Sequence, residues 1–179
     1  RRRKKKSLNI WRWNFVKNVV TRKRGTLWSS RDYPTHGSDM ALAKKMLNSP
    51  VRDLTKYPKV MRWLKTNKVY ISMTCSPKRL SKVQAVLASI DSKYLNTLYL
   101  VLPHKFGRSG ELYNSTLIKR IETNFPIVNV LRIPKDYGPI TKLLPVARLL
   151  KNQPNSIIIT IDDDICYPLG MVNEVIYQK

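Results

Sequence analysis

Acidic residues are scarce in this chain. Of its 179 residues only 11 are Asp or Glu, against 34 Lys or Arg, so the formal net charge is +23 and the isoelectric point lies near 10.3. A net charge this far from zero indicates what kind of partner the protein binds, but it does not indicate the fold. It implies an anionic partner, which is RNA, a phosphate-bearing substrate or an acidic membrane surface.

Cysteine and histidine are also rare, with two residues of each. Their spacing matches no zinc-binding pattern, which excludes the common structural zinc modules. Cys75 and Cys166 lie in or beside expected strands. We expect them to be buried free thiols and not a disulfide framework, which favours a reducing compartment.

Long apolar runs are missing as well. None approaches the roughly 18 residues that cross a membrane, and no secretory signal is visible. The first residue is Arg1 and not Met, so the numbering is expected to start after a processed or omitted leader. The hydrophobic share of 42% is enough for a core, and the length favours one domain with an extension.

Against this basic background, three acidic residues stand together: Asp162, Asp163 and Asp164, here called the Asp triplet. They follow the apolar stretch Ile157–Ile161, which is typical of a central strand covered on both faces. Like charges this close repel, and a divalent cation is a suitable partner because hard cations prefer carboxylate oxygens. The alternative is a polar turn that caps the helix after Pro168.

From residue 69 onward, apolar strand patterns alternate with helical ones. This alternation predicts an α/β fold with a mainly parallel open sheet and flanking helices, preceded by a basic N-terminal extension. Strands are expected over residues 69–75, 97–102, 127–133 and 157–161, and helices over residues 78–90, 112–123, 141–150 and 168–178.

The connections after the expected strands carry polar and basic side chains. Because the carboxyl ends of parallel strands meet at one edge, these loops should lie beside the Asp triplet. Helix N-termini and cations at that edge would form a cradle for a diphosphate. The residues concerned are Thr74, Ser76, Arg79, Arg108, Asp136, Gly138 and Lys142.

The start of the chain interleaves basic and aromatic residues. This pattern suits RNA, because cations meet phosphates while rings stack on bases. It suits an anionic membrane surface equally, and a solvated tail is the third interpretation. Short helices are expected over residues 39–48 and 58–65. The cations assigned to the anionic partner are Arg1, Arg2, Arg3, Lys4, Lys5, Lys6, Arg12, Arg22, Lys23 and Arg24.

Four segments, residues 68–80, 99–108, 136–145 and 158–168, resemble in order and spacing the glycosyltransferases of the GT-A fold, the nucleotide-diphospho-sugar transferases. The most specific are Asp-Tyr-Gly-Pro-Ile-Thr-Lys-Leu-Leu-Pro and Ile-Ile-Thr-Ile-Asp-Asp-Asp-Ile-Cys-Tyr-Pro. The resemblance covers about residues 68–175. It implies a Rossmann-like, nucleotide-sugar-binding domain over residues 68–179, with the basic extension over residues 1–67.

By this resemblance the Asp triplet is the family's DxD motif. Asp162 and Asp164 would hold Mn²⁺ or Mg²⁺ against the diphosphate of a nucleoside-diphosphate sugar. The implied activity is metal-dependent transfer of the sugar to an acceptor hydroxyl. The residues expected to contact the nucleotide sugar are Thr74, Ser76, Arg79, Asp136, Gly138, Lys142 and Asp163.

The chain departs from the family after the Asp triplet, where such enzymes place the acceptor half and the base. Few residues follow, and Glu174, the only carboxylate among them, is expected to be a solvated helix residue. The chain therefore looks like the nucleotide-binding half of such an enzyme. The alternative is a non-catalytic, glycosyltransferase-like protein that serves as an RNA-binding structural component of a ribonucleoprotein such as an organellar ribosome.

Overall fold

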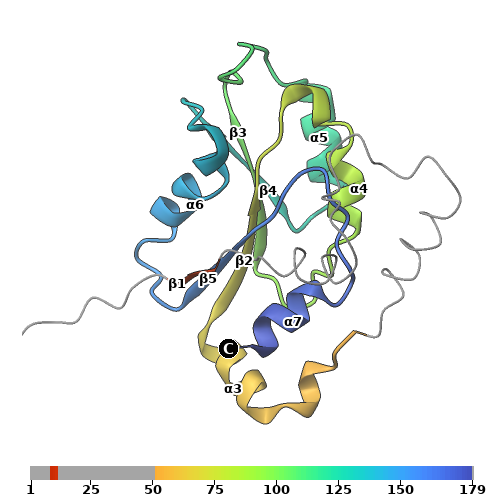
Figure 1. Ribbon diagram of the computed structural model, residues 1–179, viewed down its shortest axis with the longest axis vertical. Helices are drawn as coiled ribbons and strands as arrows, with labels where there is room; N and C mark the ends of the chain where they lie inside the picture. Colours follow the sequence, from red (N-terminus) through yellow and green to blue (C-terminus); the bar gives the residue numbers. More distant parts are fainter. Residues whose placement is uncertain (1–8, 12–50, 179) are drawn as a thin grey trace, which may run out of the picture.

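The computed structural model describes residues 9–11 and 51–178 (Figure 1). The short helix expected over residues 39–48 and the basic residues 1–6, 12 and 22–24 lie outside these ranges. No helix in the described ranges is long and apolar enough to cross a membrane.

The described residues form one five-stranded sheet in the order β1-β5-β2-β3-β4, and every neighbouring pair is parallel. This confirms the predicted α/β fold with an open parallel sheet. The strands are β1 (Asn9–Trp11), β2 (Lys68–Met73), β3 (Thr97–Pro103), β4 (Val128–Ile133) and β5 (Ser156–Thr160).

The connections from β2 through to β5 are helical, and further helices precede β2 and follow β5. The α-helices are α3 (Pro58–Thr66), α4 (Val83–Ala88), α5 (Ser115–Asn124), α6 (Leu144–Leu149) and α7 (Met171–Tyr177), and the 3₁₀ turns are η1 (Leu54–Lys56), η2 (Pro77–Arg79) and η3 (Gly138–Lys142).

Two expected helices are shorter than their apolar patterns suggested. The stretch 78–90 divides into η2 and α4, and the stretch 141–150 divides into η3 and α6. Pro77 and Pro139 each stand at the start of a 3₁₀ turn, where the ring supplies the required φ. The helical pattern thus predicted both segments, but it did not show where the tighter 3₁₀ turn gives way to α-helix.

Strand β1 was not expected from the sequence. It pairs in parallel with β5, with Asn9 opposite Ile157 and Trp11 opposite Ile159. Three residues are too few to show the alternation that marks a strand. The sheet therefore gains an edge strand from the segment that the sequence assigned to the extension.

The two faces of the sheet carry different cores. Helices α4, α5 and α7 cover one face, together with α3, and pack on Ile71, Leu100 and Ile159. Helix α6 covers the other face and packs on Tyr70 and Ile158. Figure 1 shows α6 on one side of the sheet and α4 and α5 on the other.

The strand order creates a switch point between β2 and β5. From β2 the chain moves outward to β3 and β4, and it then returns past them to add β5 on the other side of β2. Because crossovers between parallel strands are right-handed, the outgoing and returning helices lie on opposite faces. In open parallel sheets the ligand crevice forms outside the strand ends at such a point.

The segment before β2 is fastened to α7 by Arg52. Its guanidinium donates from Nε to Glu174 Oε1 at 2.7 Å and lies 4.0 Å from the centre of the Tyr177 ring. Asn173 Nδ2 donates to the Arg52 carbonyl at 2.8 Å, and Leu54 is fully buried in the core. Residues 51–57 are thus packed against the domain.

Candidate functional site

The Asp triplet lies at the switch point, directly after β5. The backbone N–H of Ile161 still donates to the Ser72 carbonyl of β2 at 3.1 Å, so the triplet begins where this pairing ends. Asp162 is exposed, Asp164 is half-buried, and Asp163 is buried with 9% of its surface exposed. The expected position at the carboxyl edge, between two parallel strands, is the one observed.

Arg79 binds two members of the triplet. Its Nη1 donates to Asp163 Oδ1 at 3.0 Å and to Asp164 Oδ2 at 3.2 Å. Burial raises the pKa of Asp163, and the nearby Arg79 charge only partly opposes this increase. A buried carboxylate thus depends on a cation supplied by η2, the turn that follows β2.

Lys142 binds the remaining member from the other face of the sheet. Its Nζ donates to Asp162 Oδ1, and its backbone carbonyl accepts a hydrogen bond from the Ser72 hydroxyl of β2. Lys142 ends η3, which leads into α6. The triplet is therefore held from both faces, by Arg79 on the outgoing crossover and by Lys142 on the returning one.

Tyr167 closes the loop that carries the triplet. Its hydroxyl accepts a hydrogen bond from the Asp162 N–H at 2.9 Å, and its own N–H donates to Ser89 Oγ at 2.9 Å. Burial raises the pKa of the Tyr167 hydroxyl, so it stays neutral. Tyr167 was not among the residues expected at the site, although a Tyr directly before Pro168 and just after the acidic turn was the available signal.

Asp136 joins two neighbouring loops. Its Oδ2 accepts from the Gly107 N–H at 2.7 Å, and its Oδ1 accepts from the Gly138 N–H at 2.8 Å and from the Thr141 hydroxyl at 2.9 Å. Burial alone would raise the pKa of Asp136, but these hydrogen bonds and the Arg108 charge outweigh burial and lower it. The side chain thus positions the loop after β3 against the loop after β4.

Gly107 and Gly138, in the two loops that Asp136 joins, occupy positions where the geometry requires glycine. A Cβ on Gly107 would lie 2.9 Å from Asp136 Oδ2, closer than such atoms approach. Gly138 has a φ of 65°, the left-handed region that other residues rarely adopt. Gly138 stands at the head of η3, where this conformation turns the chain into the 3₁₀ segment.

Thr74 and Ser76 lie in the loop after β2. The Thr74 hydroxyl donates to the Val101 carbonyl at 2.7 Å, which ties the end of β2 to β3. Ser76 precedes η2 without a side-chain capping bond. Tyr113 supports the same loop, since its hydroxyl donates to the Cys75 carbonyl at 2.7 Å.

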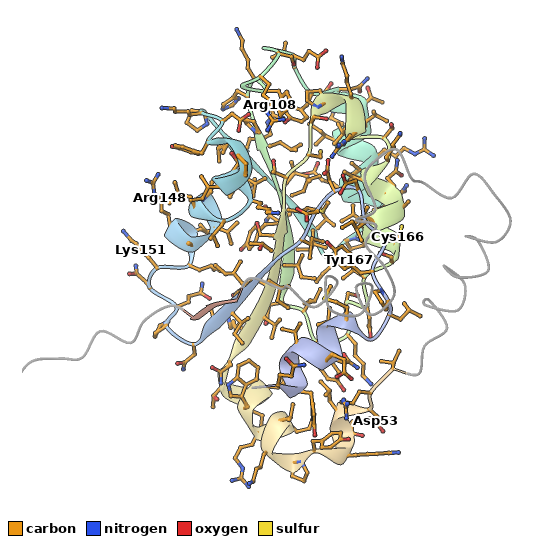
Figure 2. All side chains as sticks on the ribbon, in the orientation of Figure 1. Asp53, Arg108, Arg148, Lys151, Cys166 and Tyr167 are labelled. Carbon is orange, nitrogen blue, oxygen red and sulfur yellow. The ribbon has the colours of Figure 1, made fainter. Side chains whose placement is uncertain are left out.

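The two cysteines are both free, as expected, but only Cys75 is buried. Burial raises the pKa of its thiol, so it is an inert packing residue. Cys166 is exposed, which contradicts the expected burial, because it lies in the loop beyond β5 and not in the strand. Figure 2 shows Cys166 beside Tyr167 in this loop.

Glu174 differs from the expected solvated helix residue. It forms a salt bridge with Arg52 at 2.7 Å, and its side chain is about two-thirds buried. This contact lies on α7, and Glu174 is used there to hold the segment that enters the domain.

The triplet offers carboxylates but no closed set of metal ligands among the described residues. Within residues 9–11 and 51–178, no three His, Cys, Asp or Glu side chains gather closely enough to enclose a metal ion. Magnesium commonly uses only one or two carboxylates together with waters and substrate phosphates. Asp162 and Asp164 are the carboxylates expected to hold such an ion, and in this structure Asp162 faces Lys142 and Asp164 faces Arg79.

No protein-family model matches the chain, and no curated protein or solved structure matches it. The glycosyltransferase resemblance therefore stays a prediction made from the four sequence segments. The fold and the arrangement of the site come from the structure alone.

Proposed function

We propose that the chain binds a nucleoside-diphosphate sugar at the switch point between β2 and β5, as the donor site of a metal-dependent glycosyltransferase. One observation carries the proposal. The Asp triplet, Arg79 and Lys142 converge at this point from three separate connections. Acidic and basic side chains together match a ligand that combines a divalent cation with a diphosphate.

The acidic half of the site would hold the cation. Asp162 and Asp164 are the residues that would hold Mg²⁺ or Mn²⁺ at the diphosphate. When bound, the metal would stabilise the negative charge that develops on the leaving nucleoside diphosphate.

The basic half of the site would hold the diphosphate. In the structure, Arg79 and Lys142 neutralise the triplet. Lys142 and Arg79 lie at the triplet with cationic groups that would pair with phosphate oxygens, which Arg and Lys bind well, and Arg79 would do so while it stays paired with the buried Asp163. Because the two cations come from opposite faces of the sheet, they would grip the diphosphate from two sides.

The loops joined by Asp136 would form one wall of the same site. Gly138 allows the backbone to turn closely there, and Thr141 is fixed by the Asp136 carboxylate. The transfer breaks the bond between the anomeric carbon and the diphosphate oxygen and forms a bond from the acceptor oxygen to that carbon. The acceptor proton passes to a base, which we do not assign among the described residues.

Titration with UDP and GDP, with and without Mn²⁺, tests this proposal. Metal-dependent binding to the native chain is expected, together with its loss in Asp164→Ala. The matched control is Asp91→Ala, which removes a carboxylate outside the site and should bind as the native chain does. Binding that is absent, or that survives Asp164→Ala unchanged, would refute the donor site.

The net charge of +23 favours a second candidate, an RNA-binding structural role in a ribonucleoprotein. All ten cations proposed for this role lie in residues 1–24, outside the described ranges. Under this candidate, structured RNA would bind with an affinity that falls steeply as salt is raised, and neither nucleotide would bind.

A further inference from the structure

Two loops at the carboxyl edge of the sheet present uncovered aliphatic side chains. They are residues 104–112, after β3, and residues 134–140, after β4, here called the loop edge. Leu112 is 67% exposed and Ile140 is 50% exposed. Singly exposed aliphatic groups are common, but here two of them stand on loops that the Gly107–Asp136 hydrogen bond joins, with exposed basic residues on the same loops.

The charge of the loop edge is positive. Lys105, Arg108 and Lys135 are all exposed. The acidic residues of the same loops are already engaged: Asp136 accepts three hydrogen bonds within the loop edge, and Glu111 accepts from the Ser109 hydroxyl at 2.9 Å and lies 3.6 Å from Lys78.

Hydrogen bonds hold these loops in place. The Gly107 N–H binds Asp136, and the Phe106 N–H donates to the Glu111 carbonyl at 3.0 Å. Lys105 and Leu112 form an antiparallel bridge, which fixes Leu112 at the base of a short hairpin. The exposed side chains are therefore displayed by an ordered surface, so little conformational entropy is lost on binding.

We propose that the loop edge docks on an anionic lipid bilayer. Leu112 and Ile140 would enter the boundary between headgroups and acyl chains, while the three cations pair with lipid phosphates. RNA fits less well, because its bases stack on free aromatic faces and His104 is the one exposed aromatic ring of the loop edge. Tyr113 is buried, and the half-buried Tyr137 ring already has Lys135 and Arg148 each 5.9 Å from its centre.

This inference goes beyond the proposed donor site and does not depend on it. Loss of nucleotide binding in Asp164→Ala would leave membrane docking intact, since Asp164 lies after β5 and not in the loop edge. The two proposals can therefore fail separately.

A fluorophore on the loop edge tests the docking in the full-length chain. A polarity-sensitive naphthalene maleimide is attached to Leu112→Cys in a Cys166→Ser background, where the buried Cys75 does not react. The control is Leu149→Cys in the same background. Leu149 is 54% exposed and lies on α6 beside Arg148 and Lys151, so its surroundings are similarly basic (Figure 2).

Vesicles of phosphatidylcholine with phosphatidylglycerol are expected to shift the emission at residue 112 to the blue, with a much smaller shift at residue 149. Vesicles of phosphatidylcholine alone are expected to give neither shift. The proposal is overturned if the protein binds the anionic vesicles without a shift at residue 112, if both positions shift equally, or if it does not bind them. A shift at residue 112 produced by single-stranded RNA and not by vesicles would also overturn it.

Discussion

The two faces of the sheet are covered to different depths, and the candidate site draws on both. One face carries α3, α4, α5 and α7 and most of the buried core, whereas the other carries the six-residue helix α6. Arg79 reaches the Asp triplet from the first face and Lys142 from the second. The Asp triplet therefore lies where a thick helical layer on one face of the sheet meets a thin layer on the other.

A matched pair in β5 gives the largest expected effect. Ile158 and Ile159 are 0% and 1% exposed and face opposite sides of the sheet. Ile159→Ala should lower the free energy of unfolding by about 4 kcal/mol, and Ile158→Ala by about 2 kcal/mol, because a single short helix can settle into the cavity. Urea unfolding measures both losses. Equal losses would show that α6 packs as rigidly as the thicker layer.

The two cations of the site extend the same comparison. Arg79→Ala leaves the buried Asp163 without its ion pair, and we expect a loss of about 1–3 kcal/mol. Lys142→Ala removes the partner of the exposed Asp162, so a loss below about 1 kcal/mol is expected. Thermal and urea unfolding in low salt report both values. A larger loss of stability for Lys142→Ala than for Arg79→Ala would contradict the expectation that Arg79 contributes more to the stability of the site.

Tyr167→Phe isolates the hydrogen bond that closes the triplet loop. The ring stays in the core of the thick face, while the Asp162 N–H loses its acceptor, so about 0.5–1.5 kcal/mol of stability should be lost. Hydrogen exchange of the Asp162 amide should also quicken. Tyr177→Phe, at an exposed ring on α7, is the control and is expected to change neither quantity. Unchanged exchange at Asp162 in Tyr167→Phe would contradict the assigned role.

The smallest effect on the free energy of unfolding is expected at Asp136, on the side of the sheet that carries α6, in the acid pH range. The folded-state pKa of Asp136 lies below its ordinary value of 3.8. Its stabilisation is therefore complete above the ordinary value and is lost as the pH falls through the folded-state pKa.

Asp136→Asn tests this dependence. The difference in unfolding free energy between the native chain and this variant should shrink as the pH is lowered from neutral through the acid range. Urea midpoints over a pH series measure it, and Glu122→Gln on the exposed side of α5 controls for the loss of one charge. A difference that stays constant with pH would count against the assigned hydrogen bonds.

Most of the sheet could be predicted from the sequence because its strands are short, apolar runs separated by helical periods. The position of the Asp triplet followed for the same reason, since the end of a parallel strand fixes the edge to which it belongs. The first residues of the helices were harder to predict from the sequence, because Pro77 and Pro139 begin 3₁₀ turns that the apolar pattern does not distinguish from α-helix.

The pairings inside the site could not be read from the sequence. Arg79 and the triplet are far apart along the chain, and which cation meets which carboxylate depends on the faces taken by the two crossovers. Tyr167 and Asp136 act through backbone N–H groups, which every residue except proline carries, so no residue pattern marks their partners. The positioning roles were therefore visible only in the folded chain.

The hydrogen bond between Gly107 and Asp136 has an evolutionary consequence. These residues stand 29 positions apart, yet a methyl group on the first would collide with the carboxylate of the second. A mutation at one of these positions should therefore be accepted only with a suitable residue at the other. The sequences of the two loops are expected to change together during evolution. Among descendants of this chain, a side chain at position 107 should occur only where position 136 has also changed.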